Sequence, residues 1–337
     1  MRISAICLGG AMALLLAMPA AGQSLWNTNH ASASVCRAHG RATGPEAFSR
    51  TAQGYAWPMP AGGASAFADG TAAHVSAAAA GRANDRALAD RLLAAAQAEA
   101  FTRLDFGAAG GSSPAFVDAI VVKTVAYAVA YLRSRNALTQ AELSAIAGWV
   151  RNLQRASTQR ANSLDHEAAI IAANLMWAAA LGDNGAFRSE TSRLTRFLGR
   201  LRRNPYFTAD LRNNNEVMHH VILAAQVLRQ NGIDVFNAPQ GSNTLNMAIA
   251  YHAGQVTENG SRPVTTAGDP SERARSILRS QGFGTHVAWV PIVLATPGTE
   301  PARPAVQALE RLVRRTDGGP WWGLQIGLHT GCFFGRR

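Results

Sequence analysis

Apolar residues recur along most of the chain at the three- and four-residue spacing of amphipathic helices. From Asn84 onward this spacing returns in successive segments, and short connections rich in glycine, asparagine and proline separate them. No stretch shows the sustained alternation of apolar and polar residues that is typical of a strand. The pattern predicts helices over residues 84–103, 114–135, 139–155, 165–181, 186–203, 215–229, 244–256, 271–295 with an interruption at 282–284, and 301–315.

Two of these predicted helices begin with residues that satisfy free backbone N–H groups. Ser113 precedes Pro114, which matches a capping residue followed by a proline at the first helical position. Thr139 is followed three residues later by Glu142, the spacing of a capping box. The helical interpretation therefore rests on local signals as well as on periodicity.

Short connections between successive helices predict that neighbours in sequence pack as antiparallel hairpins. A chain of about nine such helices is expected to form an all-α fold, an incomplete (α/α) toroid or barrel of antiparallel helical hairpins. In a ring of this kind the helix starts and loops converge at one end and form a cleft. We expect residues 82–337 to make up this domain.

The N-terminal residues have the pattern of a secretory signal. Arg2 is followed by the apolar run Ile6–Met18 and then by the small residues of 19–22, so residues 1–22 are expected to be removed on export. The apolar run is too short for a transmembrane helix, and no later segment is long and apolar enough. A periplasmic protein without membrane insertion is expected. Residues 23–81, rich in alanine, glycine, serine and proline, are interpreted as an extended N-terminal arm.

The chain has three cysteines, of which Cys7 lies in the expected signal. Cys36 and Cys332 remain, one near each end of the mature chain. In an oxidising compartment this pair is able to form one disulfide between the two ends.

Composition adds a strong basic character. The formal net charge is +11, and since Lys123 is the only lysine, 31 of the 32 basic residues are arginine. Arginine matches carboxylate and phosphate groups bidentately, which favours a polyanionic partner, although a solvated basic surface explains the same composition. No nucleic-acid-binding signature, phosphate-binding loop or metal-ligand spacing is present, so we expect no nucleic-acid partner, no metal and no cofactor.

Most candidate chemistry lies between residues 162 and 236. His166 shares a helical stripe with Ile170, Ala173 and Trp177, so it is either a base at a helix start or a core histidine. Arg212 precedes three asparagines that either cap the next helix or hydrogen-bond a carboxylate. His219 and His220 point about 100° apart, so one of them faces inward.

Several segments, in order, resemble the alginate lyase family of α/α-toroid poly(mannuronate) lyases. The resemblance covers roughly half of the chain, from Lys123 to Ala295. It is carried by Lys123–Arg133, by Asp165-His166 with Trp177 and Phe187, by Phe207–Arg212, by Gln230–Asp234 and by Ala288–Pro291.

The resemblance implies β-elimination on a uronate polymer. In that family an Asn/Arg pair neutralises the C6 carboxylate, a histidine or tyrosine removes the C5 proton, and a tyrosine protonates the leaving O4. His166 matches the family histidine and Arg212 the arginine, whereas Asp165 stands where the family has its second asparagine. The family tyrosine has Glu216, His219, His220 or Tyr206 as stand-ins, and Tyr251 is discounted because it falls on the next predicted helix.

The resemblance leads to a periplasmic, monomeric polysaccharide lyase acting on an acidic polysaccharide. The alternatives are a glycoside hydrolase on the same toroid, using acids among Asp165, Glu167 and Glu216, and a polysaccharide-binding protein without catalysis. The expected catalytic residues are His166, Arg212, His219 and His220, and the expected substrate-binding residues are Asn162, Asn213, Asn214, Asn215, Tyr206 and Trp177.

Overall fold

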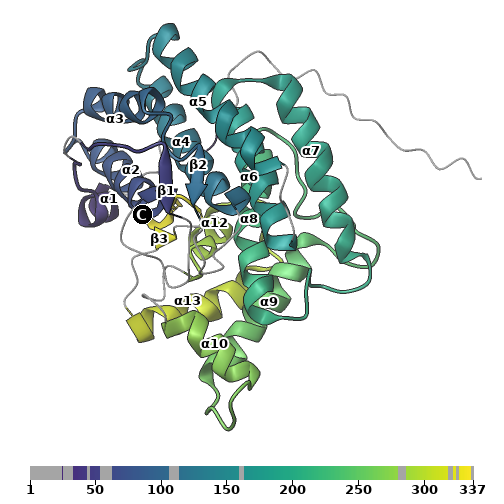
Figure 1. Ribbon diagram of the computed structural model, residues 1–337. Coiled ribbons are helices and arrows are strands. Elements are labelled where there is room, and N and C mark those ends of the chain that lie inside the picture. Colours follow the sequence, from purple (N-terminus) through teal and green to yellow (C-terminus); the bar gives the residue numbers. More distant parts are fainter. Residues whose placement is uncertain are drawn as a thin grey trace, which may run out of the picture.

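The fold was analysed in a computed structural model (Figure 1). The structure describes residue 25 and residues 33–43, 46–53, 63–105, 114–158, 163–279, 286–317, 322–323 and 326–334. The expected signal at 1–22, Ser113 and Asn162 lie outside the described residues.

The described part of the chain is helical, with four very short strands. The helices are α1 (Ala33–His39), α2 (Gly63–Ala79), α3 (Asp85–Gln97), α4 (Pro114–Ser134), α5 (Gln140–Thr158), α6 (Leu164–Leu181), α7 (Asn184–Leu198), the 3₁₀ helix η3 (Gly199–Arg202), α8 (Leu211–Gln230), α9 (Leu245–Ser261), α10 (Pro270–Arg279), α12 (Trp289–Ala295), α13 (Arg303–Asp317) and α14 (Thr330–Phe334). The strands are β1 (Thr51–Gln53), β2 (Arg103–Asp105), β3 (Trp322–Gly323) and β4 (Leu328–His329), with β1 parallel to β2 and β3 antiparallel to β4.

The helices form two concentric layers (Figure 1). Along the inner layer α2 packs on α4, α4 on α6, α6 on α8 and α8 on α12, while α3, α5, α7, α9 and α13 lie outside them. Short turns join α2 to α3, α4 to α5 and α6 to α7, and the longer segment 231–244 joins α8 to α9. Because inner and outer helices alternate along the chain, the inner helices run in the same direction. The predicted all-α toroid of antiparallel hairpins is confirmed, and the starts of α6 and α8 lie at one end of it.

Sequence decides which helices are inner and which are outer. In α6 nearly every residue from Ala168 to Ala180 is buried, as expected for a helix that is apolar all round. In α7 only Phe187, Leu194, Phe197 and Leu198 are buried, on one stripe. Gly182 allows the tight reversal between them, because it has a φ of 76° that side chains rarely adopt.

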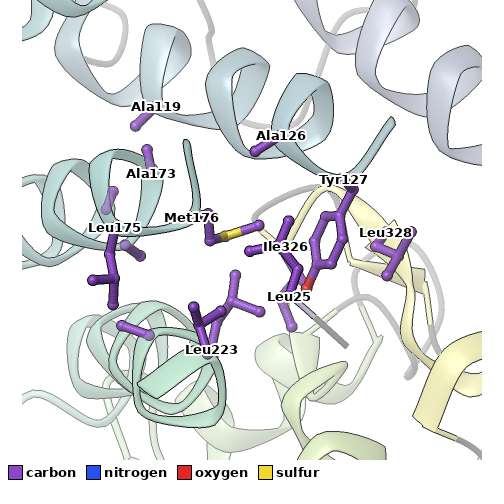
Figure 2. Packing of buried hydrophobic residues seen from close by; sticks show 14 of the residues in the cluster. Leu25, Ala119, Ala126, Tyr127, Ala173, Leu175, Met176, Leu223, Ile326 and Leu328 are labelled. Carbon is purple, nitrogen blue, oxygen red and sulfur yellow. The ribbon is translucent and has the colours of Figure 1, made fainter. Parts of the chain in front are cut away.

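The C-terminal segment packs into the end of the inner layer (Figure 2). The ring of Tyr127 on α4 lies among Leu25, Ile326 and Leu328, with Met176 of α6 nearby. These contacts join the two ends of the described chain to the middle of the fold. Gly327 packs so closely on α4 that a Cβ there would lie 2.6 Å from the Thr124 hydroxyl oxygen.

The two mature cysteines form the disulfide that the sequence allows. Cys36 of α1 and Cys332 of α14 are bonded, with their Cα atoms 4.6 Å apart and 296 positions apart in sequence. Helices α1 and α14 also pack on each other and α14 packs on α12, so the bond connects neighbouring elements of the ring.

The interpretation of residues 23–81 as an extended arm was wrong for 63–79. This segment is α2, an inner helix with Phe67 and Val75 fully buried. Its alanines, glycines and serines give little contrast between an apolar and a polar face. Small side chains nevertheless let two helices approach closely, and alanine has the highest helix propensity.

The start of α8 also differs from the prediction. The helix begins at Leu211 rather than at Asn215, and Asp210 caps it by accepting a hydrogen bond from the Asn213 backbone N–H at 2.8 Å. The capping box of Thr139 and Glu142 is confirmed, with both reciprocal hydrogen bonds present. Within the described residues, no helix combines the length and the apolar character needed to cross a membrane.

Candidate functional site

The parallel starts of α6 and α8 bring four predicted chemical residues together. Asp165 and His166 occupy the first turn of α6, and Arg212 and Glu216 lie one turn apart at the start of α8. Because α8 begins four residues earlier than predicted, these two side chains share one helical face. The guanidinium of Arg212 lies 3.5 Å from the Glu216 carboxylate.

Two carboxyl groups meet across the helix starts. Glu216 on α8 makes a side-chain hydrogen bond with Asp165 on α6. The pKa of Glu216 is raised to about 7, chiefly by burial and also by the charge of Asp165, while Arg212 opposes the shift. A hydrogen bond between two carboxyl groups requires one proton, so the pair holds a proton near neutral pH and carries one negative charge instead of two.

His166 lies beside this carboxyl pair. Its Nε2 is 3.8 Å from an Asp165 carboxylate oxygen, and its side chain is 13% exposed. Burial lowers the pKa of His166, and the nearby Asp165 charge only partly offsets this effect. At neutral pH the imidazole is therefore uncharged and able to accept a proton.

A second, buried polar layer lies beneath these side chains, and Asn215 is its centre. The Asn215 side-chain oxygen accepts hydrogen bonds from Trp289 Nε1 at 3.1 Å and from His252 Nε2 at 3.0 Å. Its amide nitrogen donates to the His286 carbonyl at 2.7 Å. An indole N–H only donates, so the orientation of the Asn215 amide is determined.

This network also determines the tautomer of His252. Since Nε2 must donate to Asn215, Nδ1 is the acceptor, and it receives the Asn214 amide N–H at 3.1 Å. The Asn214 oxygen in turn accepts from the Phe207 backbone N–H at 2.9 Å. Burial lowers the pKa of His252 to about 3, so this histidine is neutral.

His219 and His220 belong to the same buried layer and not to the surface of the site. His219 is 1% exposed, and its Nδ1 donates to the Asn215 carbonyl at 2.8 Å. His220 is fully buried, and its Nδ1 lies 3.0 Å from Nζ of Lys123, which is also fully buried. Burial lowers the pKa of His219 to about 3 and that of His220 well below its usual value. Both histidines are buried in the structure, and the expectation that they act on a substrate stays a prediction.

The predicted substrate-binding residues separate into exposed and buried groups. Asn213 is exposed and Tyr206 is partly exposed, whereas Asn214, Asn215 and Trp177 are 2–4% exposed. The side chains of the two buried asparagines form hydrogen bonds with other groups of the protein, and Trp177 packs in the core. These three side chains are buried because α6 and α8 are covered almost all round below their first turns, and their predicted role in substrate binding stays a prediction.

Tyr251, discounted on sequence grounds, lies next to Tyr206. Their ring centroids are 5.7 Å apart, and Tyr251 is 41% exposed together with Met247 one turn earlier on α9. The helix order had placed Tyr251 away from the α8 start, but α9 packs directly against α8. The two rings are tilted by 32° to each other, and Tyr206 is only partly exposed.

Sequence reasoning missed the roles of Lys123, His252 and Trp289. The signal for Lys123 was present, because a lysine inside a largely apolar helix must find a buried partner. His252 and Trp289 carried no such signal, since their partners come from a different helix. Among the described residues, no group of three or more histidine, cysteine, aspartate or glutamate side chains has an arrangement suited to a metal ion.

Comparison with known proteins gives a match in structure and none in sequence. No protein-family model and no curated protein sequence matches the chain. A solved structure of a tyrosine-to-phenylalanine variant of alginate lyase A1-III, complexed with a tetrasaccharide, is similar with a TM-score of 0.68 and 13% identity, over 94% of this chain and 96% of that one. The 1.78 Å crystal structure of alginate lyase A1-III from Sphingomonas species A1 is similar with a TM-score of 0.57 and 12% identity, over 89% of this chain and 85% of that one.

A histidine-to-alanine variant of the same lyase, also complexed with a tetrasaccharide, has a TM-score of 0.55 and 15% identity, and the match covers 75% of each chain. The chain thus has the α/α-toroid fold of alginate lyase A1-III, as the resemblance of separate segments predicted. At these identities the likeness establishes the fold.

Proposed function

We propose that this protein is a polysaccharide lyase that cleaves a uronate-containing polymer by β-elimination. One observation carries the proposal: a neutral histidine, an arginine and a carboxyl pair that retains a proton lie together at the helix starts of a lyase-type toroid. These groups correspond to the three requirements of the reaction, which are a base, a neutralising cation and an acid.

In the proposed reaction His166 removes the C5 proton of the uronate. Arg212 neutralises the C6 carboxylate, which stabilises the negative charge that forms at C5. The C5 electron pair then forms the C4=C5 double bond as the C4–O4 bond breaks. Glu216 gives its proton to the departing O4, because its raised pKa keeps it partly protonated near pH 7.

The shared proton also accounts for Asp165 in a site for an anionic sugar. Two charged carboxylates beside Arg212 would cancel its charge and repel a uronate. Hydrogen bonding between Asp165 and Glu216 leaves the pair with one negative charge, opposite the positive charge of Arg212. The first turns of α6 and α8 add the partial positive charge of helix N-termini.

The same contact disfavours a hydrolase that uses Asp165 and Glu216 as its acid pair. Retaining glycosidases hold their two carboxyl groups about 5–5.5 Å apart and inverting enzymes hold them further apart. Carboxyl groups in direct hydrogen bonding are too close for either geometry. New reducing ends without an unsaturated product would nevertheless favour hydrolysis.

We also propose that the protein works outside the cytoplasm, in the periplasm. The signal pattern of residues 1–22 supports this, and the bond between Cys36 and Cys332 fits an oxidising compartment.

The first experiment mixes the mature protein with a panel of uronate polymers and follows the ultraviolet absorbance of unsaturated uronate. The expected result is a rise with at least one polymer, and its loss in His166→Ala. Calorimetric binding of an oligouronate and an unchanged unfolding midpoint would show that the variant is folded. Full activity in His166→Ala would refute the base assignment, and no absorbance rise with any polymer would refute the lyase.

A further inference from the structure

Both ring nitrogens of His252, on α9, form hydrogen bonds with side chains near the start of α8. Nε2 donates to the Asn215 side-chain oxygen at 3.0 Å, and Nδ1 accepts from the Asn214 amide nitrogen at 3.1 Å. All three residues are buried, so the loss of either hydrogen bond would leave a polar group unsatisfied. One imidazole ring therefore connects α9 to two consecutive residues of α8.

Through Asn214, the same ring supports the segment that leads into α8. The Asn214 side-chain oxygen accepts hydrogen bonds from the backbone N–H groups of Phe207 at 2.9 Å and Thr208 at 3.4 Å. Because His252 binds the amide nitrogen of Asn214, it determines which end of that amide faces the backbone. Helix α9 thus holds both the start of α8 and the segment before it.

Asn215 extends the connection to α12. Its side-chain oxygen also accepts from Trp289 Nε1 at 3.1 Å, and its amide nitrogen donates to the His286 carbonyl at 2.7 Å. The Trp289 and His252 rings lie next to each other, with centroids 6.0 Å apart. Two donors from different helices meet at one oxygen, which leaves the Asn215 side chain a single orientation. The start of α8 is consequently held from α9 and from α12.

The two asparagines held in this way adjoin the charged groups of the site. Arg212 lies just before them in sequence, and Glu216 directly follows them. In the described part of the chain His252 forms no hydrogen bond with Arg212 or Glu216, so its effect on them passes through the asparagines. The charged groups that face Glu216 are the Asp165 carboxyl group of α6 and the Arg212 guanidinium. A hydrogen bond between carboxyl groups needs oxygen atoms about 2.5–3.0 Å apart, so a small displacement of the α8 start would break it.

We propose that His252 is a positioning residue, which keeps Arg212 and Glu216 at the start of α8 aligned with the start of α6. The inference rests on the proposed function and deepens it, because His252 acts on the acid and the neutralising cation without touching the substrate. A displacement of catalytic groups by about 1 Å is enough to reduce a rate about a hundredfold. A neutral imidazole supplies one donor and one acceptor at the required points, whereas a phenylalanine ring supplies neither.

The test follows the titration of the Glu216 carboxyl group by carbon-13 NMR of glutamate-labelled protein, with Glu216→Gln identifying the signal. In the unmodified protein the pKa of Glu216 should be about 7. In His252→Phe this pKa should fall by at least about one unit toward 4.5, because a loosened α8 start admits water and separates Glu216 from Asp165. Should His252→Phe not fold, His252→Asn replaces it. That variant keeps the acceptor for Asn214 but loses the donor to Asn215, and the same fall is expected.

His74→Phe is the matched control. His74 on α2 is as buried as His252 and also uses both ring nitrogens, with Nδ1 3.0 Å from the Thr43 hydroxyl oxygen and Nε2 3.3 Å from the Asn84 carbonyl oxygen. Its replacement should lower stability without moving the pKa of Glu216, because neither of its partners belongs to α8. A lower unfolding midpoint in both variants, with a changed pKa of Glu216 only in the His252 variant, separates positioning from general stability.

The outcomes separate this inference from the proposed function. An unchanged pKa of Glu216 in the folded His252 variant, or an equal shift in His74→Phe, would overturn the positioning role even if the unmodified protein cleaves uronate polymers. A pKa of Glu216 near 4.5 in the unmodified protein would overturn it as well. A shift confined to the His252 variant, with no cleavage of any polymer by the unmodified protein, would sustain the positioning role and refute the lyase. In an active enzyme the same shift should move the alkaline loss of activity to lower pH.

Discussion

Replacing Glu216 by glutamine should remove a penalty on stability that grows with pH. Burial and the neighbouring Asp165 raise the pKa of Glu216 from 4.5 to about 7, and the side chain is 14% exposed. In the unfolded chain this carboxyl group loses its proton near pH 4.5, whereas in the folded protein it keeps the proton up to about pH 7. The folded state binds more protons in this window, so stability falls as pH rises through it.

The size of the effect follows from the shift. A difference of about 2.5 pKa units corresponds to about 3 kcal/mol, fully present above pH 7 and absent below pH 4.5. The Glu216→Gln variant cannot ionise at this position. Relative to the unmodified protein it should therefore gain about 3 kcal/mol of unfolding free energy between pH 4 and pH 8.

The assay is guanidinium unfolding of both proteins at several pH values from 4 to 8. Glu300→Gln is the control, because it makes the same change at an exposed glutamate that also faces an arginine, Arg303 at 3.2 Å. If the difference between Glu216→Gln and the unmodified protein does not change with pH, Glu216 does not hold its proton in the folded state. That result would also refute Glu216 as the acid that protonates O4. An enzyme with a different acid would not lose activity through Glu216 as pH rises through 7.

Three other substitutions test the packing around the site and the ring closure. Cys36→Ser should lower the unfolding free energy by about 2–5 kcal/mol, because the lost bond to Cys332 links residues 296 positions apart. Breaking this bond with a reductant should lower the thermal midpoint of the unmodified protein to that of the variant. Asn215→Ala should lower the unfolding free energy measured in urea by about 2–5 kcal/mol, because a buried indole N–H and a buried imidazole N–H lose their acceptor. Asn213→Ala, at an exposed position, should lower it by less than about 0.5 kcal/mol. Asp118 is fully buried with no hydrogen-bond partner in the described part of the chain, and burial raises its pKa to about 8. The Asp118→Asn variant should therefore be more stable than the unmodified protein by as much as about 5 kcal/mol at pH 8, and nearly as stable at pH 4. A stability difference independent of pH would contradict the last expectation.

Local signals in the sequence located most helices. The capping box at Thr139 and the apolar periodicity of the later segments placed α4 to α9 within a few residues. The same reasoning failed for α2, where alanine, glycine and serine give no contrast between faces. It also misplaced the α8 start, because three asparagines were stronger capping signals than the single Asp210 that does the capping.

The candidate site was only partly predictable. His166 and Arg212 were identified as residue types at helix starts, and the structure places them at the same end of the ring. The roles of His219 and His220 could not be inferred, since burial depends on what packs against α8 from other helices. The hydrogen bond between Glu216 and Asp165 joins residues 51 positions apart, and no local pattern encodes such a contact.

The sequence by itself determined the helical class, the hairpin order and the residue types available for chemistry, because helix formation and short-turn connections depend on local propensity and periodicity. Tertiary structure alone decided which ionisable groups lose their water and which charges they meet. Glu216 keeps a proton, and His166 gives one up readily, because α6 and α8 pack side by side and bury their first turns unequally. Desolvation and proximity are properties of the packed ring, so the electrostatics of the site exist only once the chain has folded.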